Sequence, residues 1–334
     1  MRVLRMLLAA IPLAALIVPA AHATCGAEGC PFVRDAFGAT RGRYSFDLRF
    51  QGVTQDELWN GTSSTSLADI LAGVDPREHS EVELFTQTET WTAEGHAMLM
   101  PSLRLIAALP YIHREHQHML AHTRTYNPAF VNTWDFEGLG DMVVLAQYRA
   151  FTRAGGPSLE LQGGVKLPTG RTHVPDETKD NFTYESTLEP SIRPGTGSTD
   201  WLTGAVYVQP LPWHNTTPLT ASVIAKWTGK GTDDFEVGDE IQAGISSGYT
   251  PKSWITLLAQ VNYSGHGRDI SADETEAAHT GMQALYLTPG ASIRLSPALL
   301  LYGIYQQRVW AHSEEPTVIG ANHFVIGTTY SLGH

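Results

Sequence analysis

"WITLLAQVNY", residues 254–263, alternates apolar and polar side chains with a period of two residues. Ile255 and Val261 fall on one face of an extended chain, whereas Gln260 and Asn262 fall on the other. A strand with one apolar and one polar face suits a sheet that separates two different environments. The stretch therefore predicts a two-faced β-strand.

The same alternation recurs along the chain, for example in "SLELQGGVKL" at 158–167 and "PLTASVIAKW" at 218–227. We expect twelve strands, at about residues 43–51, 79–92, 97–110, 140–150, 158–167, 198–209, 218–227, 238–250, 253–264, 284–295, 298–307 and 322–332. Every second connection is long, at 52–78, 111–139, 168–197, 228–237, 265–283 and 308–321, and the others are brief.

An even strand number with long and short connections in alternation is typical of outer-membrane barrels, which have short periplasmic turns and longer extracellular loops. The alternative is an exported soluble β-sandwich, although sandwich strands are usually shorter. The sequence thus predicts an all-β fold: an antiparallel transmembrane β-barrel of about 12 strands in the bacterial outer membrane.

The N-terminus has the features of a secretory signal peptide, because Arg2 and Arg5 precede an apolar run that ends in an A-x-A cleavage site. We expect a signal peptide at 1–23, a periplasmic segment at 24–42 that is either a lumen plug or a tethered tail, and the barrel at 43–334. Beyond the signal, no run of about 18 apolar residues predicts a transmembrane helix.

The two cysteines, Cys25 and Cys30, meet an oxidising compartment after export, so we expect a local disulfide, with metal or thiol chemistry as the alternative. The formal charge of the whole chain is −12, and loss of two arginines with the signal makes it more negative. That sign argues against nucleic acid as a partner. The expected partners are outer-membrane lipid, lipopolysaccharide and a small-molecule solute.

If the apolar faces of the strands meet lipid, the polar faces line the lumen. By this parity the lumen-lining residues are Asp47, Arg49, Glu81, Glu83, Glu89, Arg104, Gln147, Arg149, Glu160, Gln162, Lys166, Lys226, Glu240, Gln242, Gln260, Asn262 and Arg294. The set carries both signs of charge, which fits either a wet channel or salt-bridged rungs that stiffen a sealed barrel. Twelve strands make a pore narrower than that of general porins, so a transported solute would be small.

Aromatic residues near the strand ends suit the two interfacial girdles of a membrane barrel. They are Trp91, Tyr111, Trp201, Tyr207, Trp227, Tyr249, Trp254, Tyr263 and Tyr330.

"YIHREHQHMLAH", residues 111–122, concentrates histidines at the start of an expected loop. The tentative metal ligands are His113, His116, His118 and His122. Continuing the parity of the preceding strand places His113 on the outer face and the other three on the lumen side. Two imidazoles at i and i+2 can share a zinc, copper or nickel ion. A solvated loop and a pH-responsive gate are the alternatives.

Three stretches, "GLGDMVVLAQYR" (138–149), "LQGGVKLPTGR" (161–171) and "PGTGSTDWLTGAVY" (194–207), resemble the MetA-pathway phenol-degradation transporter family of outer-membrane barrels, which is similar in outline to hydrocarbon and fatty-acid uptake barrels. The resemblance implies uptake of small aromatic or apolar molecules. Physically, Gly138 and Gly140 are expected to allow backbone conformations closed to other residues, and Pro168 to end a strand because it lacks a ladder donor.

We expect no enzyme, because parity assembles no histidine, serine and acid set, and no catalytic residue or resident cofactor is assigned. The function that the sequence favours is passive passage of a small, aromatic or apolar solute through the outer membrane. The alternative is a barrel that handles copper, zinc or nickel through the histidine segment.

Overall fold

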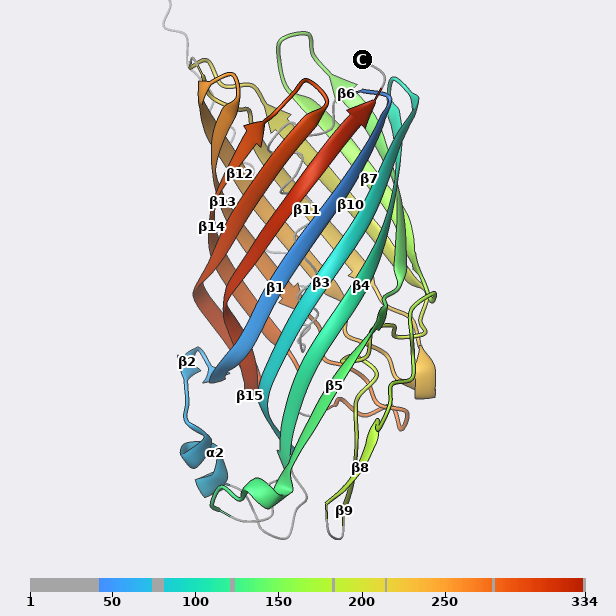
Figure 1. Cartoon of the computed structure of the whole chain (residues 1–334), viewed down its shortest axis with the longest axis vertical. Coiled ribbons are helices and arrows are strands. Elements are labelled where there is room, and N and C mark those ends of the chain that lie inside the picture. The colour runs from blue at the N-terminus through green and yellow to red at the C-terminus, as the bar shows by residue number, and fades with distance from the viewer. Residues whose placement is uncertain are drawn as a thin grey trace, which may run out of the picture.

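The computed structural model describes residues 42–73, 81–120, 124–181, 184–213, 215–277 and 280–332. The barrel is built from β1 (Tyr44–Gly61), β3 (Glu81–Met100), β4 (Leu103–Leu120), β6 (Met142–Thr152), β7 (Ser158–Leu167), β10 (Asp200–Gln209), β11 (Leu219–Trp227), β12 (Glu240–Lys252), β13 (Ile255–His266), β14 (Met282–Arg294) and β15 (Leu299–Leu332) (Figure 1). The other described elements are β2 (Ser63–Ser64), α2 (Leu67–Gly73), η1 (Pro128–Phe130), β5 (Val131–Leu139), β8 (Thr178–Asn181), β9 (Tyr184–Thr187) and η2 (Thr232–Asp234).

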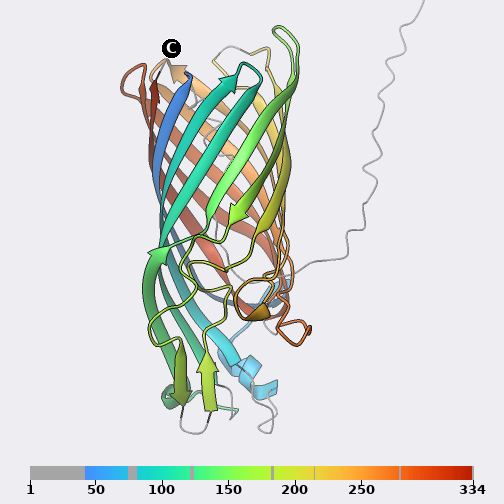
Figure 2. The same ribbon diagram turned by 90° about the vertical axis from the view of Figure 1, so that its right-hand side faces the viewer.

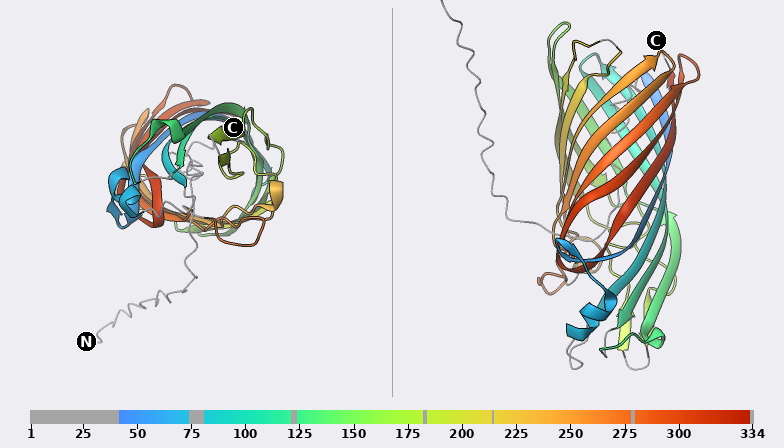
Figure 3. Two further views of the ribbon diagram at one scale, coloured as in Figure 1. Left: turned by 90° about the horizontal axis from the view of Figure 1, so that it is seen from below. Right: turned by 90° about the vertical axis from the view of Figure 1, so that its left-hand side faces the viewer.

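The barrel strands pair antiparallel in chain order, and β15 closes the ring by pairing with β1 from Tyr44↔Leu332 onward. Seen along its axis, the sheet forms a complete ring (Figure 3). Closure removes the open edges of the sheet, whose unpaired backbone groups would be unfavourable inside lipid. The predicted all-β, antiparallel barrel is confirmed.

β15 contains two arms. Residues 300–313 pair with β14 and residues 313–332 pair with β1. The backbone N–H of Ser331 donates to the carbonyl of Ala298, so the end of the strand returns to its beginning. When the two arms of β15 are counted separately, the eleven assigned strands of the ring become twelve, as the sequence predicts.

Several strands run further than their sequence pattern predicts. β1 extends to Gly61, and β4 begins after a turn at 101–102 and runs to Leu120. The expected loop at 111–139 is therefore mostly strand. β5 pairs with residues 111–119 of β4, towards the extracellular end, while β6 pairs with residues 103–108, towards the periplasmic end. The expected loop at 308–321 is likewise strand, within β15. The histidine-rich segment thus lies in a strand and not in a loop.

The outer face of the ring is apolar and exposed, as a lipid-facing surface must be. Trp91 and Tyr111 are a cross-strand pair on this face, 50% and 39% exposed, and Phe50 lies 4.9 Å from Trp91 between ring centroids. Trp201 and Trp227 form a second such pair. Of the other predicted girdle residues, Tyr263 is half-buried. The rest are exposed, namely Tyr207, Tyr249, Trp254 and Tyr330.

Loops and the β8–β9 hairpin gather at the end opposite the C-terminus, which is the extracellular end of an outer-membrane barrel (Figure 2). There α2 packs through Leu71 on Val82 and Met119 of the extended strands. The signal peptide, the segment before residue 42, both cysteines and His122 lie outside the described residues. Within the described residues, no helix is long and apolar enough to cross a membrane.

Candidate functional site

The inner face of the barrel carries the polar side chains that parity assigned to it. Asp47, Glu83, Lys166, Lys226 and Glu240 are buried. Arg49, Glu81, Arg104, Glu160 and Arg294 are half-buried on the same parity, and Arg149 is exposed near the turn that follows β6. The polar lining is interrupted, because buried apolar side chains such as Ile106 and Leu258 also lie on the inner face.

Glu89 is an exception to the predicted lumen parity. A register shift between Glu83 and Phe85 exchanges the two faces of β3. Thr86 and Thr88 therefore point inward, whereas the Glu89 side chain is 41% exposed on the outer face. A β-bulge inserts one extra residue, and one residue is enough to invert a pattern of period two.

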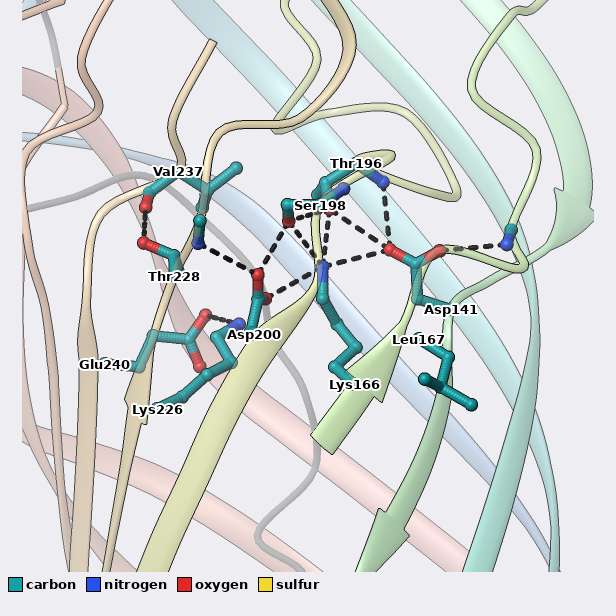
Figure 4. Close-up of polar contacts among 12 residues, drawn as sticks. Asp141, Lys166, Leu167, Thr196, Ser198, Asp200, Lys226, Thr228, Val237 and Glu240 are labelled. Carbon is teal, nitrogen blue, oxygen red and sulfur yellow. Dashed lines mark hydrogen bonds and ion pairs between the residues drawn. The ribbon is translucent and has the colours of Figure 1, made fainter. Parts of the chain in front are cut away.

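The centre of the inner polar network is Lys166 on β7. Its Nζ atom lies 3.0 Å from Asp141 Oδ2 and 2.9 Å from Asp200 Oδ2. Figure 4 shows the ammonium between the two carboxylates, with Thr196 and Ser198 completing its surroundings. All three charged side chains are at most 5% exposed, so neither carboxylate has water as its main partner.

The same carboxylates hold the loop 168–199, which connects β7 to β10. Asp141 accepts hydrogen bonds from the backbone N–H groups of Gly170 (2.9 Å) and Thr196 (3.0 Å). Asp200 accepts from the hydroxyl of Ser198 at 2.7 Å. We call the set Asp141, Lys166, Thr196, Ser198 and Asp200 the latch. It fastens both ends of the loop to the wall.

Close backbone approach explains the glycines of this region. A Cβ on Gly170 would lie 2.8 Å from the Cα of Gly195, and one on Gly140 would lie 2.8 Å from Pro110 Cγ. Neither Gly138 nor Gly140 has a positive φ angle. The expectation of special backbone conformations at Gly138 and Gly140 is therefore wrong, since it is space that they provide. Pro168, in contrast, follows the last residue of β7 as predicted.

The middle of the loop 168–199 packs on the inner face of β5. Leu188 and Ile192 form one buried cluster with Trp134 and Phe136. Arg193, which is 4% exposed, donates to the carbonyls of Leu188 and Thr172 and forms an ion pair with Asp233 at 3.1 Å. The loop consequently covers part of the extracellular mouth and is braced against the next loop.

Beneath the loop lies a cavity of about 200 Å³. Its lining includes Ile106, Leu145, Leu202 and Ile224, which form one apolar wall from β4, β6, β10 and β11. The charged side chains of the lining are Arg49, Glu94, Arg114, Asp141, Lys166, Arg193, Asp200, Lys226 and Glu240. The cavity is therefore amphipathic, with one apolar side and charges of both signs around it.

Two further ion-pair groups stiffen the interior. Arg49 lies 2.7 Å from Glu94 Oε2, and the other oxygen of Glu94 lies 2.6 Å from His96 Nε2. Glu240 accepts from Lys226 and lies 2.9 Å from His266 Nε2. Buried charges of this kind persist because each has an opposite partner.

Asp47 is held by neutral donors as well as by Arg49. It accepts from the hydroxyls of Tyr302 (3.0 Å) and Thr329 (2.6 Å). Towards the periplasmic turns, Glu160 lies 2.9 Å from Arg149, and Arg104 lines a shallow pocket with both residues.

The histidine segment divides as its strand parity predicts. His116 and His118 are buried and face inward, with their Nε2 atoms 2.6 Å apart. His113 is on the opposite face, where its side chain is 45% exposed and its Nε2 atom lies 2.8 Å from the carboxylate of Asp135. His113 therefore cannot share an ion with the buried pair.

Sequence reasoning missed Asp141, Asp200, Glu94, Arg193 and Glu189 as interior groups. Asp141 and Asp200 lie within the quoted motifs, and parity is the signal that could have placed them inward: Asp141 has the parity of Gln147, and Asp200 has the parity opposite to the outward Trp201. Loop residues such as Arg193 and Glu189 give no such signal, because parity does not extend into irregular chain.

Residues 244–248 read "GISSG", which has the spacing of the G-x-S-x-G nucleophile motif, although the sequence prediction of no enzyme did not take it into account. That motif functions on a sharp turn from a strand to a helix. Here it lies within β12, and Ser246 is buried opposite Thr220 and Gln260 of the neighbouring strands. Ser246 is thus part of the barrel wall.

A closed antiparallel barrel with an apolar outer face, aromatic pairs near the strand ends and a polar interior defines an outer-membrane β-barrel. Its structure is similar to that of the COG4313 outer membrane channel from Pseudomonas putida F1, with a TM-score of 0.59 and 12% identity over 86% of this chain and 95% of that one. At this identity the similarity shows the fold alone.

The transport unit of the autotransporter AIDA-I from Escherichia coli superposes less well, with a TM-score of 0.49 and 11% identity over 87% of this chain and 91% of that chain. No protein-family model and no curated protein matches the sequence.

Proposed function

We propose that this protein is a passive outer-membrane channel for a small solute that has an apolar part, and that the loop 168–199 forms its constriction. The observation that carries the proposal is the amphipathic cavity beneath that loop. A solute crossing the barrel there meets the apolar wall of Ile106, Leu145, Leu202 and Ile224 on one side and charged groups on the other.

The size of the cavity supports a solute with a single ring. Its volume is about 200 Å³, and an apolar protein cavity of about 150 Å³ binds benzene. A molecule such as phenol would place its ring against the apolar wall and its hydroxyl among polar groups. This solute class agrees with the resemblance of the three quoted stretches to the phenol-degradation transporter family.

The latch supports the assignment of the constriction to the loop. Lys166 and its two carboxylates lie in the wall of the cavity, and they also bind the loop ends. Displacement of the loop would therefore widen the passage without unfolding the barrel. Outside the barrel, lipid and lipopolysaccharide would meet the apolar belt and the extracellular strand extensions.

The experiment is solute flux into liposomes that contain the purified protein. We expect phenol to enter faster than a sugar of similar mass, after subtraction of the flux through protein-free liposomes. Because phenol crosses lipid by itself, charged 4-hydroxybenzoate serves as a second solute. Equal flux with and without protein for both aromatic solutes contradicts the proposed function.

A further inference from the structure

Hydrogen bonding fixes the tautomer of His116, one of the two buried histidines of β4. The hydroxyl of Thr86 donates to Glu83 Oε1 at 2.8 Å, and its oxygen lies 2.6 Å from His116 Nδ1. Since the single proton of that hydroxyl is already used, His116 Nδ1–H must be the donor. The lone pair of His116 is then on Nε2, which faces His118.

The surroundings of His118 contain buried polar atoms without a hydrogen bond. Within the described part of the chain, His118 Nδ1 and Glu189 Oε2 are enclosed and accept or donate no hydrogen bond. Glu189 belongs to the loop 168–199, and its Oε1 atom lies 4.0 Å from His118 Nδ1. Burying a polar atom without a hydrogen bond is unfavourable, so a cation between these atoms would remove that cost.

We propose that His116, His118 and Glu189 bind a divalent transition-metal ion such as zinc, nickel or copper. Their ligand atoms lie within 4.8 Å of one another. Two imidazoles and one carboxylate suit these ions, whereas magnesium and calcium prefer oxygen ligands alone.

The chain around the cluster also resembles the support that metal-bound histidines receive elsewhere. A ligating imidazole usually donates its second N–H to a hydrogen-bond acceptor, which fixes its orientation. Thr86 and Glu83 supply that arrangement for His116. Glu81 Oε2, at 3.6 Å from His118 Nδ1, is near enough to provide a further oxygen.

The position of the cluster assigns the ion a structural role. His116 and His118 belong to the barrel wall and Glu189 belongs to the loop, so the ion would fasten the middle of the loop as the latch fastens its ends. None of the three residues lines the cavity. The ion is therefore a fixed cross-link and not a solute in transit, and the inference holds whether or not the barrel conducts.

The test is calorimetric titration of zinc into the full-length barrel, purified in detergent with a tag that contains no histidine. The wild type is expected to bind one zinc ion per chain. Glu189→Gln keeps the shape of the side chain but removes its charge, so it should weaken binding at least about 10-fold. His118→Ala should do the same. The matched control is His113→Ala, which alters an exposed histidine of the same strand and should leave the affinity unchanged.

Trp134 provides a second readout, because its ring lies 6.0 Å from His116 and 5.6 Å from His118 between centroids. Copper should quench its fluorescence in the wild type, and Trp134→Phe should remove that component. Heat-dependent migration in SDS gels checks that each variant is folded, and Glu189→Gln alone decides if the histidine variants do not fold. Absence of stoichiometric binding to the wild type, or unchanged affinity and quenching in Glu189→Gln, overturns the proposal.

Discussion

The Nζ atom of Lys166 lies 3.0 Å from the Oδ2 atom of Asp141, within the wall of the barrel and directly below the loop 168–199. The ion pair joins β7 to the residue that precedes β6, and Asp141 also accepts two backbone hydrogen bonds from the loop. One buried ion pair therefore supports both the wall and the loop that we propose as the constriction. The first two predictions separate these roles.

Lys166→Met should both destabilise the barrel and release the loop. The substitution leaves Asp141 and Asp200 close together without their cation, and loss of one partner of a buried ion pair costs about 3–5 kcal/mol. We expect a lower free energy of unfolding in urea, measured by tryptophan fluorescence in detergent. Single-channel recordings should show a larger conductance than that of the wild type.

Lys226→Met is the matched control for the loop. Lys226 is also a buried inner lysine, and it pairs with Glu240, which lies in the wall on β12. We expect comparable destabilisation but a smaller increase in conductance than in Lys166→Met, since Lys226 lines the cavity but pairs within the wall. An equal conductance change in both variants would mean that barrel strain and not loop release sets the current.

Gly170→Ala should displace the loop without changing any charge. The new Cβ would lie within 2.7–2.9 Å of backbone atoms of Gly140, Gly195 and Asp141, none of which can rotate away. Gly163→Ala, on β7 just before the loop, is the control, because no atom beyond its chain neighbours lies within 4 Å of the Cβ that the substitution adds. Protease nicking of the loop in intact detergent-solubilised barrels should increase for Gly170→Ala only. Equal nicking in both variants would refute the close-approach explanation.

Ile224→Ser should change solute preference. The substitution makes the apolar cavity wall more polar while keeping the charged groups in place. In the liposome assay we expect the ratio of 4-hydroxybenzoate flux to arabinose flux to fall several-fold. A ratio equal to that of the wild type would remove the apolar wall from solute recognition.

Thr86→Val should weaken zinc binding by about 10-fold or more through orientation of His116, since second-shell groups of metal ligands have effects of this size. The hydroxyl that receives Nδ1–H is lost, although the side-chain shape is retained. Thr88→Val serves as the control on the same face, because Thr88 contacts Arg114 and not the histidines. Calorimetry that gives wild-type affinity for Thr86→Val would show that the hydroxyl does not orient the ligand.

Hydrophobic periodicity was sufficient to predict the barrel because one-residue alternation is a local property. It correctly separated Ile255 and Val261 from Gln260 and Asn262 on β13, where the two apolar residues are outward and the two polar ones are buried. It failed at Glu89, since the bulge after Glu83 depends on pairing with β4 and leaves no mark in the pattern.

Parity also could not reveal which polar groups meet. Lys166 is 25 residues from Asp141 in the sequence and further still from Asp200. Only the register of β6, β7 and β10 brings the three side chains together. Apolar residues on the inner face, such as Leu258 and Tyr302, were missed for a different reason. The polar-lumen rule describes an average face, and the buried cluster of Leu258 and Tyr302 departs from it.

Flux of 4-hydroxybenzoate through the wild-type protein in liposomes is the measurement that tests the central claim most directly. The account predicts protein-dependent entry of this solute that exceeds the entry of arabinose, and faster entry of both in Lys166→Met, where the constriction is released. Protein-containing liposomes as impermeable as pure lipid, for the wild type and for Lys166→Met alike, would contradict a channel through this barrel.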